Sequence, residues 1–145
     1  MEKMIQNMLS IVGDGFTESF CESLLKRLTS FGYDIKEDDA WQLCFIMQKV
    51  KHHINNSCNT TSIPDGLFNV AIDMTCGEFL FTKKQTGQLE IANLDLTGAI
   101  ASVSAGDTSV SFDNSASDEE KFNQLLNYLM TKGEGDFVCY RKLKW

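Results

Sequence analysis

The stretch IPDGLFNVAIDMTCGEFL, residues 63–80, decides how this chain folds. Pro64 suits the first turn of a helix, because the N–H that proline lacks has no helical partner there. From Leu67 onward only Asn69, Asp73 and Glu78 are strongly polar, and the apolar side chains fall on two faces at helical spacing. These faces hold Leu67, Val70, Ala71 and Met74, and Phe68, Ile72, Cys76 and Phe79. A helix that is apolar nearly all round is buried nearly all round, so residues 64–80 predict a central helix or one shared with a neighbouring subunit.

Amphipathic patterns flank this stretch on both sides. They predict helices at residues 2–12, 16–30, about 38–56 and 117–132. The third of these has an apolar stripe, which further aromatic and aliphatic residues are expected to widen. The stripe is Leu43, Met47, Val50 and Ile54, widened by Trp41, Phe45 and Ile46.

Helix starts are marked by polar side chains. Asp38 or Asp39 is a plausible cap for the third helix, and Ser117 with Glu120 has the spacing of a capping box at the last one. Asp73 and Glu78 lie five positions apart on the central helix, so they do not share a face. Pairing of each with a Lys or Arg across an interface is favoured over catalysis.

A β-hairpin is predicted at residues 99–112. Residues 99–104 and 108–112 alternate in polarity and flank the short turn Ala105-Gly106-Asp107. The fold class is therefore mainly α: a bundle of four to five helices with a hairpin inserted before the last helix.

We expect one domain spanning residues 1–145, because no linker marks a second one. Its parts are an N-terminal helical extension (1–30), core helices (37–80), the hairpin (99–112), the last helix (117–132) and a docking tail (137–145).

Composition narrows the function classes. The chain has 145 residues, 43% of them apolar and only one proline, which argues against a disordered or collagen-like chain. Its formal net charge of −7 makes it a poor DNA-gripping module, although it could surround DNA without holding it. No apolar run approaches the roughly 18 residues of a membrane span. The first residues do not resemble a signal peptide, so a cytoplasmic setting is expected.

Chemistry-bearing residues favour structural roles. The five cysteines are scattered without a metal-binding or redox spacing, so most are expected to be buried thiols. His52 and His53 are adjacent and point apart on a helix, and two partly exposed histidines are favoured over a metal site. We therefore expect no catalytic residue, metal or cofactor. The aromatic and basic residues of the tail favour docking on an acidic surface over stacking on bases.

The order of these pieces resembles the head–tail connector family of tailed bacteriophages, also called head completion or neck adaptor proteins. The resemblance covers residues 24–145 and rests on four segments in order. They are Asn55-Asn56-Ser57-Cys58-Asn59 at a helix end, Ile63-Pro64-Asp65-Gly66-Leu67 before the apolar helix, the hairpin Ala101–Phe112, and the ending Tyr140-Arg141-Lys142-Leu143-Lys144-Trp145.

The resemblance implies a structural virion protein, made in the bacterial cytoplasm and located in the phage neck. Such proteins form a homo-oligomeric ring beneath the portal protein, extend the DNA channel without sequence-specific binding, and offer a surface to the tail or the next neck protein. Neither a membrane nor a cofactor is implied. On this hypothesis the contacts with other subunits involve Leu67, Phe68, Asn69, Val70, Ile72, Asp73, Phe79, Val103, Val110, Phe112, Tyr140, Arg141 and Trp145.

Three other functions remain open. A tail-completion or tail-terminator protein would contain more strand, and a helical regulatory module would stay monomeric and bind a host protein. A hydrolase would need a nucleophile and a base in one pocket.

Overall fold

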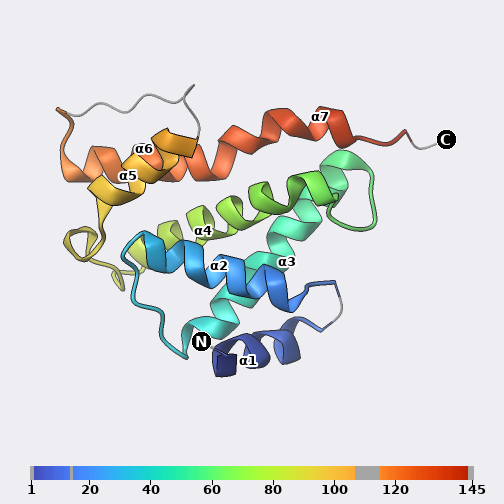
Figure 1. Ribbon diagram of the computed structural model, residues 1–145, viewed down its shortest axis with the longest axis horizontal. Coiled ribbons are helices and arrows are strands. Elements are labelled where there is room, and N and C mark those ends of the chain that lie inside the picture. The colour runs from blue at the N-terminus through green and yellow to red at the C-terminus, as the bar shows by residue number, and fades with distance from the viewer. Residues whose placement is uncertain (1, 14, 107–114, 144–145) are drawn as a thin grey trace.

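The computed structural model describes residues 2–13, 15–106 and 115–143, and these are helical throughout most of their length (Figure 1). The α-helices are α1 (Glu2–Val12), α2 (Glu18–Ser30), α3 (Asp39–Cys58), α4 (Phe68–Gln85), α5 (Leu96–Gly106), α6 (Asp118–Thr131) and α7 (Phe137–Tyr140). Short 3-10 turns lie at η1 (Asp65–Leu67), η2 (Ile91–Asn93) and η3 (Lys132–Asp136). The mainly α fold class is confirmed. Within these ranges no helix has both the length and the apolar character to cross a membrane.

Helix α4 is the centre of the molecule, as its apolar sequence predicts. Helices α2, α3 and α6 all pack against it, and Figure 1 shows it running between them. Its buried residues are Ala71, Ile72, Met74, Thr75, Cys76, Gly77, Phe79, Leu80 and Lys83. Gly77 lets α6 approach closely, because a Cβ atom placed there would lie 2.6 Å from Cγ of Met130 and 3.1 Å from Cβ of Leu129 on α6. Most of the cover of this helix thus comes from its own chain, although Phe81 near its end is 44% exposed.

Capping side chains set several helix boundaries. The Ser117 hydroxyl accepts a hydrogen bond from the Glu120 N–H at 3.2 Å, which confirms the predicted start of α6. Thr17 caps α2 in the same way through the Phe20 N–H at 3.1 Å. Helix α3 ends at Asn59, whose φ of 56° lies in the left-handed region that stops helices.

The predicted β-hairpin is wrong where the structure describes it. Residues 99–104 lie inside helix α5, no strand occurs among the described residues, and residues 108–112 fall outside them. Two observations explain the difference. The Asp95 carboxylate accepts the Gly98 N–H at 3.0 Å, which starts a helix, and the buried residues Leu96, Ala99 and Val103 have helical spacing.

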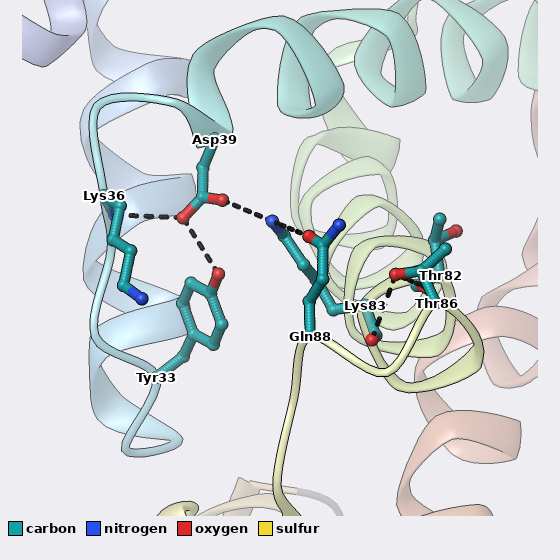
Figure 2. A network of polar contacts seen from close by, with 7 residues as sticks. All are labelled: Tyr33, Lys36, Asp39, Thr82, Lys83, Thr86 and Gln88. Carbon is teal, nitrogen blue, oxygen red and sulfur yellow. Dashed lines mark hydrogen bonds and ion pairs between the residues drawn. The ribbon is translucent and has the colours of Figure 1, made fainter.

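Asp39 does not cap α3 but lies at the centre of a buried polar network (Figure 2). Its Oδ2 atom accepts hydrogen bonds from the Tyr33 hydroxyl and the Lys36 N–H, both at 2.9 Å. Its Oδ1 atom lies 2.7 Å from Nζ of Lys83 on α4, and that ammonium also donates to Gln88 at 2.8 Å. The network ties the start of α3 to the end of α4, and Lys83 is a buried residue that the sequence pattern did not reveal.

Replacing Asp39 alone should destabilise the fold strongly. Asp39→Ala leaves the Lys83 ammonium buried without its anion, and the expected loss is about 3–5 kcal/mol of unfolding free energy. The double variant Asp39→Asn, Lys83→Met should recover most of it, because the amide oxygen still accepts from Tyr33 and the chain buries no charge. Urea denaturation measures both values. A double variant as unstable as Asp39→Ala would contradict this account.

Two buried thiols should make the stability fall in alkali. Burial raises the pKa of Cys21 and of Cys44 from 9.0 to about 11. The folded chain holds these protons more tightly than the unfolded chain does. Each thiol therefore contributes about 2 kcal/mol to the unfolding free energy below pH 9, and this contribution is lost as the pH approaches 11. Urea denaturation between pH 8 and 11 gives the unfolding free energy at each pH, and this free energy should fall less steeply with pH in the double variant Cys21→Ala, Cys44→Ala. The exposed thiol provides the control, since Cys139→Ala should leave the wild-type slope.

Candidate protein-interaction groove

Two adjoining hollows form a groove along one side of α4. The first, of about 400 Å³, is lined by Ser23, Arg27, Asn69, Ile72, Asp73, Ser102, Val103 and Tyr128. The second, of about 310 Å³, is lined by Val70, Asp73, Tyr128, Leu129, Lys132, Gly133 and Asp136. They share Asp73 and Tyr128, so we treat them as one feature and name it the α4 groove. Helices α2, α4, α5 and α6 and the 3-10 turn η3 supply its walls.

An ion pair lies in the α4 groove. Nε of Arg27 on α2 donates to Oδ1 of Asp73 on α4 at 3.1 Å, and the guanidinium also lies 4.9 Å from the centre of the Phe31 ring. Both charged side chains are about a quarter exposed, at 28% and 26%. Burial raises the pKa of the Asp73 carboxyl above its ordinary value, and the guanidinium opposes that rise. The groove therefore offers a fixed charge pair that is partly shielded from water.

Five of the residues expected from the sequence to contact other subunits meet in this groove. They are Asn69, Val70, Ile72, Asp73 and Val103. Asn69 is exposed, whereas Ile72 and Val103 are buried and form the apolar base. Residues from separate helices are thus gathered on one open surface.

Other predicted contact residues do not reach this surface. Leu67 and Phe79 are fully buried inside the chain, and Phe68 is half-buried against the Phe20 ring. Val110, Phe112 and Trp145 lie outside the described residues. The apolar helix therefore contributes its polar edge, with Val70 and Ile72, to the groove, while its other apolar residues hold the core together.

Tyr140 and Arg141 lie at another place, where the chain returns to the end of α3. Nε of Arg141 donates to the Ser57 carbonyl at 3.0 Å, and the Lys142 N–H donates to the Cys58 carbonyl at 2.7 Å. Asn59 completes the contact by donating its amide to the Lys142 carbonyl at 2.9 Å. The last carbonyls of a helix have no partners within it, so this segment satisfies them and places a cation at the negative helix end. The described part of the predicted docking tail docks on its own chain.

Asp73 and Glu78 pair with cations as predicted, but from helices of the same chain. Glu78 Oε2 lies 3.3 Å from Nζ of Lys49 on α3, on the side of α4 away from Arg27. The five-residue separation explains this, because it turns the two carboxylates to different neighbours.

The prediction that Trp41 and Phe45 widen the apolar stripe of α3 is wrong. Their side chains are 72% and 71% exposed, among the most exposed large apolar residues of the described chain. Successive helical residues turn by about 100°, so both lie roughly opposite Leu43 and Met47. Counting these angles would have placed them on the outside.

The histidines and cysteines behave as ordinary surface and core residues. His53 is half exposed and pairs with Glu134 at 3.3 Å. Cys21, Cys44, Cys58 and Cys76 are buried, which confirms the expectation for most of the thiols, and Cys139 is exposed. Among the described residues no three side chains of the metal-binding types are grouped closely enough to hold an ion.

Comparison with known proteins gives no match, whether against family models, curated sequences or solved structures.

Removing Arg27 should expose the cost of the half-buried carboxylate. Arg27→Met takes away the group that lowers the Asp73 pKa, so that pKa should rise further in an NMR titration. The folded chain then holds the proton of the Asp73 carboxyl even more tightly than the unfolded chain does. The protonated carboxyl therefore stabilises the fold at acid pH, and this stabilisation is lost as the pH rises and the carboxyl must ionise. The unfolding free energy should drop by about 1–3 kcal/mol at pH 7 and by less at pH 4.

The adjacent lysine is the matched control for this experiment. Lys26 pairs with Glu22 at 2.7 Å on the open face of α2, with 64% of its side chain exposed. Lys26→Met should change the stability by less than about 0.5 kcal/mol at either pH. An Asp73 pKa that falls in Arg27→Met would be incompatible with the role given to the ion pair.

Proposed function

We propose that this chain is a structural virion protein that forms an oligomeric ring between the portal and the tail of a tailed bacteriophage. The ring completes the head and extends the channel for DNA. The α4 groove is the surface that contacts the portal protein, which is the partner above the ring.

The observation that carries this proposal is the groove itself. Residues singled out as subunit contacts from the sequence come together there from α4 and α5, beside an ion pair. The groove combines an apolar base, an exposed amide and two opposite charges, which are the groups that fix a protein segment in register. Its two parts, of about 400 and 310 Å³, provide the room that a few side chains of a partner need.

The charge of the chain supports a channel component. With 13 basic and 20 acidic residues, the chain offers few cations to hold phosphates. DNA that slides through such a ring meets little of the attraction that makes DNA-binding proteins grip.

The secondary structure argues against the alternative phage protein that is richest in strand. A tail terminator was expected to contain more strand, and the described residues contain helices and turns only. A regulatory module remains the competing class, and it predicts a monomer that binds a host protein rather than a phage particle.

Placing a charge in the groove should prevent attachment to the portal. Asn69 is exposed on the first turn of α4, so Asn69→Arg should fold normally by circular dichroism yet block the groove with a long cation. Electron microscopy of filled heads or isolated portals from the same phage, mixed with the protein, measures attachment. Wild-type protein should decorate the portal vertex, and Asn69→Arg should do so at least about 30-fold more weakly, as expected for a central interface residue.

The control adds the same charge elsewhere. Gln6 is an exposed amide on α1, and Figure 1 shows α1 and α6 on opposite sides of the molecule. Gln6→Arg should decorate the vertex as the wild type does. Wild-type protein that never decorates a phage vertex would refute the proposed function, and normal decoration by Asn69→Arg would refute the role of the groove.

A further inference from the structure

The two ends of α3 carry surfaces of complementary character. At its start lies a group of exposed aromatic side chains beside carboxylates, and at its end lies a segment with exposed apolar side chains beside cations. The helix between them is 20 residues long.

The aromatic surface spans α3 and α4. Trp41 and Phe45 are the exposed large apolar residues of α3, and Phe81 of α4 is 44% exposed. Asp39 pairs with Lys83 and Lys49 pairs with Glu78, so the two helices run antiparallel. Along their helices, Phe45 and Phe81 both lie between these two ion pairs. Phe45 is one turn before Lys49, and Phe81 is one turn after Glu78, the residue that pairs with Lys49. We name Trp41, Phe45 and Phe81 the aromatic patch.

Carboxylates border the aromatic patch. Asp38 precedes Trp41 by three residues and Phe45 by seven, which puts it on the same stripe of α3. It is exposed and makes no capping hydrogen bond. Asp34 and Glu37 are exposed nearby, and these three carboxylates outnumber the two cations beside them, Lys36 of the same loop and Lys3, whose Nζ lies 3.9 Å from Glu37 Oε1. Aromatic faces beside carboxylates attract side chains that combine apolar stems with positive heads.

The segment at the other end of α3 has this combination. Val138 and Leu143 are 67% and 75% exposed, and Arg141 and Lys142 lie between them. Backbone and side-chain bonds to Ser57, Cys58 and Asn59 hold the segment in place. A segment that is already ordered loses less conformational entropy on binding than a free one. We name residues 138–143 the basic segment.

The patch and the segment cannot satisfy each other within one chain. Trp41 and Cys58 are 17 positions apart on α3, which is about 26 Å at 1.5 Å per residue. The Lys142 N–H is bonded to Cys58, so the basic segment stays at the far end. Because α3 holds the aromatic patch and the basic segment apart within one chain, the patch of one copy is free to meet the segment of another copy.

We propose that the aromatic patch of one copy binds the basic segment of the next copy, head to tail. This contact joins different surfaces of the two partners, so it leaves a free patch at one end and a free segment at the other. Repeated with a closing rotation, it produces a ring. The inference deepens the proposed function, on which the ring form rests, and supplies the contact between neighbouring subunits.

Two double variants test this contact, each removing one half of it at exposed positions. Trp41→Ser with Phe45→Ser removes the patch, and Lys142→Glu with Leu143→Ser removes the segment while keeping the backbone bond of Lys142. Sedimentation velocity across protein concentrations should show wild-type self-association and at least about 30-fold weaker association for each double variant. Circular dichroism and thermal unfolding check that both remain folded.

Mixing the two double variants gives the decisive result. The first keeps an intact segment and the second an intact patch, so together they should form one contact and stop at two chains, twice the 16.3 kDa of one chain. Self-association of the segment variant at wild-type strength would show a contact of the patch with itself and overturn the inference. A mixture that stays monomeric, or a wild type that is monomeric at every concentration, would also overturn it.

Attachment to portals separates this inference from the proposed function. Head-to-tail association without decoration of a portal vertex leaves the contact standing and refutes the function. Decoration of the vertex by wild type and both double variants alike leaves the function standing and refutes the contact.

Discussion

The burial of α4 is the constraint on which the rest of the structure depends. A helix with apolar residues on nearly every side needs neighbours on every side, and α2, α3 and α6 supply them. Three of its charged residues, Asp73, Glu78 and Lys83, then meet partners on α2 and α3: Arg27, Lys49 and Asp39. The pairs of Asp73 with Arg27 and of Glu78 with Lys49 are partly exposed, so they also determine where polar surface remains, whereas the pair of Lys83 with Asp39 is buried. The α4 groove lies along one such edge.

Much of this fold could be predicted from the sequence, because single helices are encoded locally. Apolar spacing located α1, α2, α3, α4 and α6, and Ser117 marked the start of α6. What covers α4 is not encoded locally. A helix that is apolar on all sides must be covered, but its sequence is the same whether its own chain or another subunit covers it. Lys83 was missed for a related reason, since only the fold brings Asp39 close enough to stabilise a buried ammonium.

Residues 99–104 show where a local pattern is ambiguous. Alternating small and branched side chains satisfy strand periodicity, yet Leu96, Ala99 and Val103 satisfy helical periodicity equally well. The Asp95 cap and a tertiary contact favour the helix: the Asp95 N–H donates to the Phe31 carbonyl at 3.0 Å, just past the end of α2. Gly32 permits this approach, because a Cβ atom there would lie 2.6 Å from the Asp95 nitrogen. The end of α2 thus fixes where α5 begins.

The candidate contact surfaces at the two ends of α3 follow from the way the polar groups at each end find partners. The last carbonyls of α3 need donors, and the returning chain provides them through Arg141 and Lys142. Folding therefore positions the basic segment before any partner is present, and its exposed Val138 and Leu143 are a by-product of capping the helix. At the other end, Asp39 turns inward to Lys83, while Asp38 and Trp41 stay outside. One helix with two differently terminated ends thereby presents two different surfaces, which is the asymmetry that head-to-tail assembly requires.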